Sequence, residues 1–515
     1  MRQVFTTGQG ATVRSPDRRG HAGLLTAAAL GAVLAAGGVR SAELRIEHAT
    51  VVAPGGRSVA DAEVIVRDGR IASIGRAHGK RAAPAAGAQV LDGTALFLAP
   101  GLIDSHVHLG GIPGMSDEQE RAHPDIARAA RAQFPRSFLA FGFTTLVDLI
   151  STPEAMARWK SHEVVPDTYF CGGAPVVDGY PLNYIPKAVR YSALPYMLVE
   201  PGAAVPAGVE PATHTPQAVV ARMKADGAIC VKTFFERGFG DAHDLPVPRP
   251  ETIRELVRVA HAAGLPVLMH ANAAEAQRFA LDSGVDIIAH GLWNTTDRAP
   301  AGELTPDMKV ILDRVVATRT YWQPTMQVLY GLHDLFEPGF LADPRLPRVL
   351  PGSLIEWYRT REGQWFRDAV APPDPAVPAA TQEATMRGNF EAAIGRVHAA
   401  AGYLAGHHGR LLFGTDTPSA PTYANPPGLN GWLEMQHLVA AGVSAAQIFE
   451  AATVRNAQAL KLDREVGTVE VGKRANLLLL RTDPRRSIEG YEHIVRVILG
   501  GRVLDPAELA ADRAP

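Results

Sequence analysis

The stretch GLIDSHVHL, residues 101–109, is a short apolar run that carries His106 and His108 two positions apart. Side chains at alternate positions of a strand leave the same face, so both imidazoles can reach one metal ion. Later apolar runs each contain or end on one polar residue: GAICVKTFF with Lys232, GLPVLMH with His270, VDIIAH with His290 and LLFGTD with Asp416. Because helical stretches separate these runs, the pattern indicates a parallel βα barrel or a wound sheet. In a barrel the carboxyl ends of all strands meet on one face.

These polar residues have ordinary structural explanations one by one, but together they predict a metal centre. A single histidine at a strand end is more often a core or loop residue than a ligand. Lys232 is harder to explain, because a buried lysine without a partner is costly. The ordered set therefore predicts metal binding by His106, His108, Lys232, His270, His290 and Asp416.

The overall composition limits the classes of function. The chain has 515 residues with 51 Lys and Arg against 53 Asp and Glu, so its formal net charge is −2. Such a balance gives no overall field to attract nucleic acid, and we expect a small-molecule substrate and a homo-oligomer instead. A hydrophobic content of 46% excludes wholesale disorder. Two cysteines, Cys171 and Cys230, exclude a Cys-rich zinc module, so nitrogen and oxygen must supply most ligands of any metal.

Residues 22–38, AGLLTAAALGAVLAAGG, form a long uncharged apolar stretch that follows Arg18 and Arg19. The stretch predicts a secretory signal peptide, with residues 1–42 as leader and junction. A membrane anchor is the alternative, but the stretch is short, rich in Ala and Gly, and lacks the aromatic belt of a membrane span. We therefore expect a secreted or periplasmic protein without a stable membrane anchor.

Both ends of the remaining chain contain short strands with glycine turns, for example AEVIVRDGRIASIG (62–75) and HIVRVILGGRVLD (493–505). We assign residues 43–97 and 466–510 to β-rich flanks and residues 98–465 to the barrel. Proline-rich stretches predict loops inserted in the barrel at about 178–216 and 330–400.

The chain resembles the amidohydrolase superfamily, in particular its imidazolonepropionase and prolidase-like branch. The resemblance is carried by PGLIDSHVHL, FGFTTLVDL (141–149), MHAN (269–272), DIIAHG (286–291), FGTDT (413–417), EAATVRNAQALKL (450–462) and GTVEVGKRANLLLL (467–480). It implies an α/β fold, a (β/α)8 TIM barrel with a small β-sandwich domain that is built from both chain ends. Asn476 stands where the family more often has Asp, in the β-rich flank and away from the chemistry.

The resemblance also implies two divalent metal ions. His106, His108 and Asp416 would hold one ion and His270 and His290 the other. Lys232, carboxylated by carbon dioxide, would bridge them as an anionic oxygen ligand. Histidine and carboxylate ligands favour Zn²⁺. Relatives of the imidazolonepropionase kind use one metal and no lysine ligand, so a single ion is the alternative and Lys232 favours two.

The predicted activity is hydrolysis of a C–N amide bond in a dipeptide, an N-acyl amino acid or a cyclic amide. A metal-bound hydroxide would attack the carbonyl, with Asp416 as metal ligand and proton shuttle. Hydrolysis of a lactone, ester or phosphotriester on the same centre is the alternative. A non-catalytic barrel scaffold is a further alternative, but all six predicted ligands are present.

Several further expectations concern the surroundings of the site. We place the seventh barrel strand at TYWQPTMQVL (320–329). The aromatic stretch EWYRTREGQWF (356–366) is either a lid over the barrel mouth or a helix packed on the barrel. Tyr180, Tyr184 and Trp293 either line the pocket or pack as ordinary aromatics.

Two loop residues and the cysteines complete the candidates. Arg237 and His243 follow the lysine strand, where they could pair with a substrate carboxylate or remain solvated. Cys230 is expected as a small buried hydrophobe beneath Lys232, on the same strand face. A disulfide between Cys230 and Cys171 is left open rather than predicted.

Overall fold

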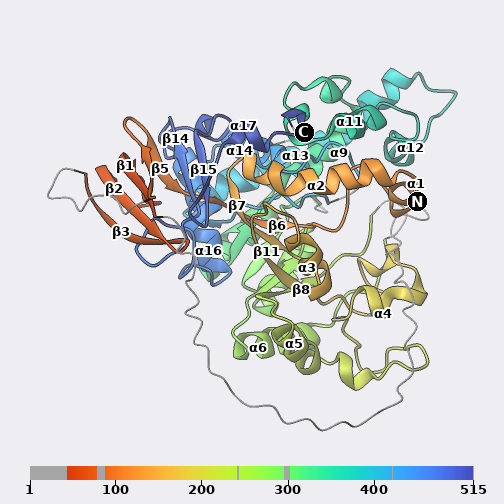
Figure 1. Cartoon of the computed structure of the whole chain (residues 1–515). Coiled ribbons are helices and arrows are strands. Elements are labelled where there is room, and N and C mark those ends of the chain that lie inside the picture. The colour runs from red at the N-terminus through yellow and green to blue at the C-terminus, as the bar shows by residue number, and fades with distance from the viewer. Residues whose placement is uncertain (1–42, 78–86, 240–242, 295–301, 420, 514–515) are drawn as a thin grey trace, which may run out of the picture.

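The computed structural model describes residues 43–77, 87–239, 243–294, 302–419 and 421–513 (Figure 1). The expected signal peptide, residues 1–42, lies outside the described residues. Within the described ranges, no helix is both long enough and apolar enough to cross a membrane.

The centre of the molecule is a parallel eight-stranded sheet in the order β13-β12-β11-β10-β9-β8-β7-β6. Its strands are β6 (Leu102–Val107), β7 (Phe143–Asp148), β8 (Asp167–Gly173), β9 (Cys230–Phe234), β10 (Val267–His270), β11 (Ile287–Ala289), β12 (Tyr321–Gln323) and β13 (Arg410–Leu411). The residues after β13 return to β6, because Ser105 N donates to Phe413 O and His108 N donates to Thr417 O, at 3.3 and 2.7 Å. These bonds close the ring, and the expected (β/α)8 barrel is confirmed.

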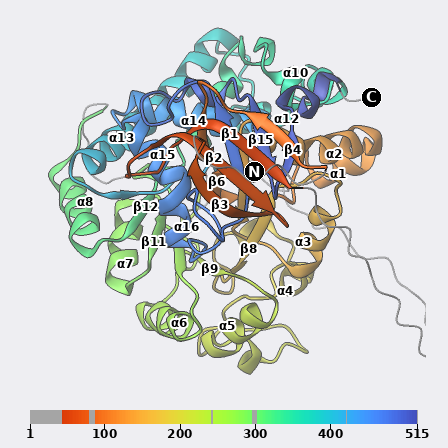
Figure 2. The same cartoon turned by 60° about the vertical axis from the view of Figure 1, so that its left-hand side comes forward.

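Helices surround the barrel (Figure 2). The α-helices are α1 (Asp117–Ala122), α2 (Pro124–Ala140), α3 (Pro153–Lys160), α4 (Arg190–Ala193), α5 (Pro216–Ala225), α6 (Pro250–Ala262), α7 (Ala274–Ser283), α8 (Pro306–Thr318), α9 (Met326–His333), α10 (Leu346–Val349), α11 (Gly352–Tyr358), α12 (Trp365–Val370), α13 (Ala379–Gly406), α14 (Leu429–Ala440), α15 (Ala445–Glu450), α16 (Asn456–Ala459) and α17 (Pro506–Leu509). Helices α3, α5 and α8 begin alike, with a threonine whose hydroxyl accepts a backbone N–H of the first turn and a proline directly after it. This Thr-Pro start satisfies a free N–H and fixes the first helical φ.

Both chain ends contribute to a second sheet of eight strands, in the order β16-β15-β14-β5-β1-β2-β3 with β4 paired to β1. The strands are β1 (Leu44–Val51), β2 (Val59–Arg67), β3 (Arg70–Arg76), β4 (Gln89–Asp92), β5 (Phe97–Pro100), β14 (Leu477–Leu480), β15 (Arg496–Leu499) and β16 (Arg502–Leu504). Leu44, Val64, Leu477 and Ile498 belong to one buried apolar cluster of this sheet. The expected small β-domain from the two ends is therefore present, to the left of the barrel in Figure 1.

The seventh barrel strand is shorter than expected. Strand β12 ends at Gln323 and helix α9 begins at Met326, whereas the sequence predicted a strand to 329. Pro324 cannot donate to a strand ladder, and Thr325 has φ +45°, so the extended conformation ends there. The apolar run after Thr325 is helical.

The inserted aromatic stretch packs on the barrel. Trp357, Tyr358 and Phe366 are buried in the main core, and helices α10 and α11 contact α2. The Tyr358 hydroxyl donates to Pro113 O at 2.5 Å and Trp365 Nε1 donates to Gly114 O at 2.9 Å. The packing interpretation is thus correct for these residues, and they brace the loop that follows His108.

The two cysteines are bonded to each other. Cys171 on β8 is the register partner of Cys230 on β9, and their sulfurs form a disulfide in the fully buried barrel interior. The expectation of an apolar site beneath Lys232 is correct, but the bond itself was not predicted.

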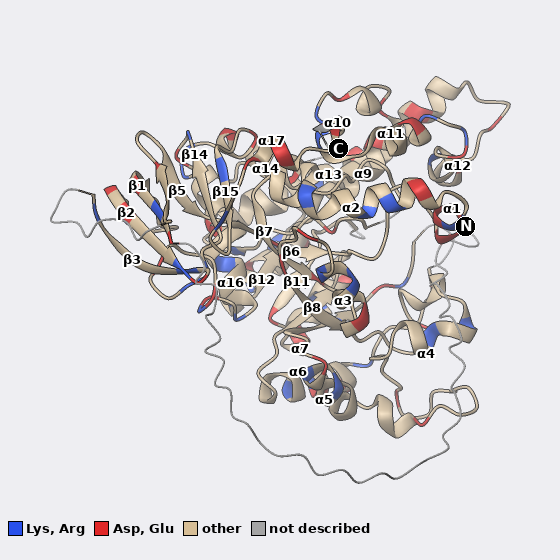
Figure 3. Cartoon of the chain, in the orientation of Figure 1, with Lys and Arg blue, Asp and Glu red and all other residues tan. Residues whose placement is uncertain are grey.

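Basic and acidic residues are interspersed along the same elements (Figure 3). This distribution agrees with the near-zero net charge of the chain, −2.

Candidate metal centre

The predicted ligands lie at or next to the carboxyl ends of barrel strands. His106 belongs to β6 and His108 follows it, and Lys232 and His270 belong to β9 and β10. His290 directly follows β11, and Asp416 follows β13 across the seam from β6. The closed ring therefore brings together residues from both ends of the barrel sequence.

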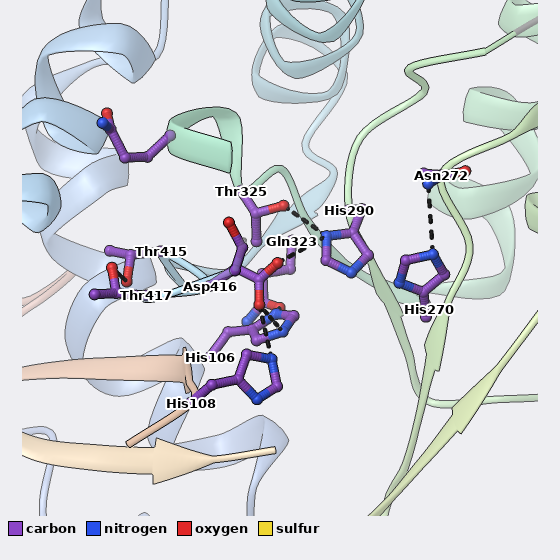
Figure 4. Close-up of polar contacts among 12 residues, drawn as sticks. His106, His108, His270, Asn272, His290, Gln323, Thr325, Thr415, Asp416 and Thr417 are labelled. Atoms are coloured by element: carbon purple, nitrogen blue, oxygen red, sulfur yellow. Dashed lines mark hydrogen bonds and ion pairs between the residues drawn. The ribbon is translucent and has the colours of Figure 1, made fainter. Parts of the chain in front are cut away.

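His106, His108 and Asp416 form a compact group (Figure 4). Asp416 Oδ1 lies 2.9 Å from His106 Nε2 and 2.8 Å from His108 Nε2. One ligand atom of each residue falls within 4.8 Å of the others, the geometry of a shared ion. His108 is the most open of the three, with 26% of its side chain exposed.

His270 and His290 form a second group beside the first. Their ring centroids are 4.4 Å apart, and the His290 ring lies 5.1 Å from that of His106. His290 Nδ1 is 3.8 Å from Asp416 Oδ2, so Asp416 faces both groups. The structure thus brings all four histidines and the aspartate into one place.

Lys232 is buried, with 1% of its surface exposed, and among the described residues its Nζ has no hydrogen-bond partner. Burial lowers the pKa of the lysine to about 7, although Asp416 opposes the shift. After burial, the charge of Lys232 is among the causes that lower the pKa of His106 and His270. Such an amine is poised to exist uncharged at neutral pH, the form that reacts with carbon dioxide.

A chain of hydrogen bonds fixes which nitrogen of His106 carries a proton. The Ser105 hydroxyl donates to Phe413 O at 2.6 Å, so it must accept from Gln323 Nε2, at 2.7 Å. The Gln323 Oε1 atom therefore faces His106 Nδ1, at 2.6 Å, and a carbonyl oxygen can only accept. His106 Nδ1 thus carries the hydrogen, and Nε2 keeps its lone pair.

This tautomer tests whether a metal fits the site. Burial lowers the pKa of His106 to about 4, so the ring is neutral near pH 7. Its Nε2 lone pair and Asp416 Oδ1 are then two acceptors 2.9 Å apart, and they lack the alignment of a hydrogen bond. Two facing acceptors need a cation between them. Imidazole nitrogen and carboxylate oxygen are suitable ligands for a divalent ion, and the residues fit it.

The sequence did not predict the side chains that contact the histidine rings and hold them in place. Gln323 holds His106, and the Thr325 hydroxyl lies 2.9 Å from His290 Nδ1. Glu236 Oε2 lies 3.2 Å from His270 Nε2 and is 8% exposed. Such partners orient metal-ligating imidazoles and set their tautomers. A usable signal was present for Gln323, a polar residue at the end of an apolar run.

Backbone strain is concentrated at the site. His290, Thr325 and Asp416 have φ values of +78°, +45° and +59°. Positive φ is uncommon for residues with a Cβ, and for a β-branched threonine it is an outlier. The surrounding contacts must therefore hold these three residues in place.

Aromatic rings flank the second histidine group. Tyr180 lies 4.8 Å from the His270 ring and Trp293 lies 5.2 Å from the His290 ring, centroid to centroid. Phe239 contacts both Tyr180 and Trp293, at 5.6 and 6.4 Å. Tyr180 and Trp293 are thus at the site, as one of the two interpretations expected, and Tyr184 touches Tyr180 at 6.1 Å.

The two cationic loop candidates lie elsewhere. Arg237 forms an exposed ion pair with Glu275 at 2.8 Å, and His243 is exposed. The structure does not bring either residue together with the histidines.

A sequence profile described as the amidohydrolase family matches residues 97–318 and 384–504. The dihydroorotase of Pelotomaculum thermopropionicum (strain DSM 13744 / JCM 10971 / SI) is 31% identical over 155 residues, 30% of this chain and 32% of that protein. An adenine deaminase of Deinococcus deserti (strain DSM 17065 / CIP 109153 / LMG 22923 / VCD115) is 37% identical over 78 residues, 15% of this chain and 13% of that protein. The matched stretches thus span a third or less of these curated relatives.

Solved structures share the fold over nearly the whole chain. A molinate hydrolase aligns with a TM-score of 0.62 at 16% identity, covering 91% of this chain and 96% of that one. A Xaa-Pro dipeptidase with bound methionine aligns with a TM-score of 0.58 at 18% identity, covering 90% and 100%. A putative prolidase from Bifidobacterium longum gives 0.57 at 22% identity, covering 90% and 94%. At these identities the likeness establishes the architecture.

Proposed function

Because the chain belongs to the amidohydrolase family, we propose that it is a metal-dependent hydrolase that cleaves a C–N amide bond of a small molecule. The substrate would be a dipeptide, an N-acyl amino acid or a cyclic amide. The observation that carries the proposal is the pair of facing acceptors, His106 Nε2 and Asp416 Oδ1, 2.9 Å apart.

We propose two ions, with zinc as the favoured metal. His106, His108 and Asp416 would hold one ion, and His270 and His290 the other. Lys232, carboxylated on its amine, would bridge them, which supplies a partner for a buried Nζ that has none among the described residues. Bound divalent ions supply a nucleophilic water at neutral pH and polarise the scissile carbonyl.

The remaining roles belong to side chains of the chain itself. Asp416 faces both histidine groups, so its carboxylate is placed to take a proton from the attacking water and pass it to the leaving nitrogen. Burial raises the pKa of Tyr180 well above its usual value, so the phenol stays protonated as a hydrogen-bond donor beside His270. Because the side chains around the centre are buried, few water molecules reach it, and the electrostatic interactions of Asp416 and Tyr180 are stronger than in water.

The test combines metal analysis with a substrate panel. The purified protein, supplied with Zn²⁺ and bicarbonate, is assayed on amides, esters, lactones and phosphotriesters, with Asp416→Asn alongside. The proposal expects bound metal and amide hydrolysis that Asp416→Asn abolishes. Activity confined to phosphotriesters would overturn the amide assignment. A protein without bound metal that hydrolyses none of these substrates would be a non-catalytic scaffold. An Asp416→Asn variant that retains full activity without bound metal would mean another kind of enzyme.

We also propose that the protein is exported. The leader-like stretch at residues 22–38 and the buried Cys171–Cys230 disulfide both suit an oxidising compartment. N-terminal sequencing of the protein from the periplasmic or secreted fraction tests this proposal, and an intact N-terminus in the cytosol contradicts it.

A further inference from the structure

Helix α9 starts directly behind the metal centre, and its start is built differently from other helix starts of the molecule. Its N-cap is Thr325, as the N-caps of α3, α5 and α8 are Thr152, Thr215 and Thr305. Those three hydroxyls accept a backbone N–H of their own first turn. The hydroxyl of Thr325 makes no such capping bond.

The Thr325 hydroxyl points to His290 instead, 2.9 Å from its Nδ1 (Figure 4). This direction goes with the left-handed backbone of Thr325, φ +45° and ψ +51°, which a threonine rarely adopts. Two residues earlier on the same segment, Gln323 holds His106 Nδ1 at 2.6 Å. One short segment therefore orients a histidine of each group.

The buried side chain of a glutamate caps α9 in place of Thr325. Glu434 lies on helix α14, has no exposed surface, and is 109 positions beyond Thr325 in the chain (434 − 325). Its Oε1 accepts from Met326 N at 3.1 Å and its Oε2 accepts from Gln327 N at 2.7 Å. The first two free amides of the helix are thus satisfied from outside the segment.

We infer that Glu434 is a positioning residue of the metal centre. By capping α9, it releases the Thr325 hydroxyl from the capping role and keeps it on His290. The inference rests on the proposed function for the role of His290 as a ligand. Among the described residues, the hydrogen bonds of the Glu434 side chain go to the α9 amides and not to the site histidines.

The prediction for Glu434→Gln follows from hydrogen-bond chemistry. An amide has one accepting oxygen, so one of the two α9 amides loses its partner. A threonine at the N-cap normally accepts from this turn, so we expect the Thr325 oxygen to replace the lost acceptor. When it turns toward the helix, His290 loses the contact that fixes its ring, and such losses typically weaken metal affinity about 10–100-fold.

The experiment measures Co²⁺ affinity of the metal-free full-length protein by titration of the ligand-field absorption, which needs no substrate. Glu434→Gln and Thr325→Val are each expected to weaken binding about 10–100-fold. In the double variant the Glu434 change should add less than about twofold to the Thr325→Val loss, because both act through one hydroxyl. Unchanged affinity in Glu434→Gln, or losses that multiply in the double variant, would overturn the inference.

Thr305→Val is the matched control, because it removes the same hydroxyl from the N-cap of α8. It is expected to lower the unfolding midpoint while leaving Co²⁺ affinity unchanged. Weaker Co²⁺ binding in this control would contradict a role specific to Glu434 and Thr325.

If Glu434→Gln does not fold, Glu434→Asp replaces it. This variant keeps both accepting oxygens but draws them back by one methylene. It should weaken Co²⁺ binding in the wild-type background but not in a protein that already carries Thr325→Val. The opposite pattern overturns the inference.

These outcomes separate the inference from the proposed function. If Glu434→Gln and Thr325→Val weaken Co²⁺ binding as expected but the wild type hydrolyses no amide, the proposed function alone is contradicted. Amide hydrolysis with unchanged Co²⁺ affinity in Glu434→Gln would contradict the inference alone. A wild-type protein that binds no Co²⁺ overturns both.

Discussion

His106 with His108, and His270 with His290, are held in different ways. The first pair shares a carboxylate oxygen, Asp416 Oδ1, at 2.9 and 2.8 Å. Among the described residues the second pair shares no carboxylate oxygen: Glu236 Oε2 lies 3.2 Å from His270 Nε2, and His290 Nδ1 is 3.8 Å from Asp416 Oδ2. Its other neighbours include aromatic rings, and the charge of the buried Lys232 is among the causes that lower the pKa of both histidines.

The difference shows which half of the centre has a full set of candidate metal ligands without any modification of the chain. The first half already contains two histidines and an anion, a set that suits a divalent cation. The second half has no carboxylate that its two histidines share, and the proposed carboxylated Lys232 would supply an anionic oxygen between them. We therefore expect the two halves to respond differently to substitution and to carbon dioxide.

The largest effect is expected for Asp416→Asn, which breaks the half that is complete. The amide cannot carry the proton between water and leaving group, so kcat should fall about 10²–10⁴-fold. Steady-state kinetics with metal analysis measures this. Asp282→Asn, an exposed partner of Arg314 on the surface, is the control and should keep wild-type kcat. A kcat of Asp416→Asn within tenfold of wild type would contradict the role.

Lys232→Met should break only the second half. Methionine is of similar length and cannot be carboxylated, so metal content should fall from two equivalents to one and activity about 10²-fold. In the wild type, reloading of the second ion should require bicarbonate, while loading of the first should not. Two bound equivalents in Lys232→Met, or reloading unaffected by removal of carbon dioxide, would contradict the bridge.

Trp293→Ala sharpens the comparison on the aromatic side. Trp293 borders the His290 ring at 5.2 Å, and a lost aromatic contact is worth about tenfold in kcat/KM for an amide with an aromatic group. For the analogous amide that carries an acetyl group instead of the aromatic group, kcat/KM should fall less. Trp159→Ala, equally buried at 7% exposure but packed against α2 through Phe138, is the matched control and should affect both substrates alike. Equal losses on both substrates in Trp293→Ala would contradict a substrate contact.

The smallest expected effect is on the pH dependence of stability, through helices α9 and α14. His437 on α14 stacks on Tyr330 of α9, with ring centroids 3.4 Å apart. Burial, with His398 and His333 nearby, lowers the pKa of His437 from 6.5 to about 3. The unfolded chain therefore binds this proton first, and stability is lost as pH falls from about 6.5 toward 3.

His437→Phe keeps the stacked ring and removes the proton site. Between pH 6.5 and 5 the variant should lose less unfolding free energy than wild type, by about 1.6 kcal/mol. Urea unfolding at the two pH values measures the difference. An identical pH dependence in both proteins would show that His437 is not kept neutral by the fold.

The convergence of the six candidate residues could be predicted from sequence because each stands within or at the end of an apolar run. Strand ends of a parallel barrel converge whatever lies between them, so neither loop lengths nor insertions had to be known. The fold class predicts one shared face for these residues, and the structure adds the distances between their side chains.

The groups that orient those ligands could not be predicted in the same way. Thr325 was placed inside a strand, because the apolar run MQVL continues the pattern of TYWQ across Pro324. Glu434 lies in helix α14 and meets α9 only through tertiary packing. The Cys171–Cys230 bond depends on the register of two strands, which composition and spacing do not specify.

The seam between β6 and the residues after β13 has a consequence for folding. His106 O accepts from Asp416 N at 2.7 Å, so the last backbone bonds that close the ring are those that join the first and last ligands. These residues are separated by 310 positions, and contacts of such long range form late because loop closure is entropically costly. We therefore expect an incompletely synthesised or partly folded chain to lack the proposed hydrolytic centre. The proposed activity should appear only together with completion of the barrel.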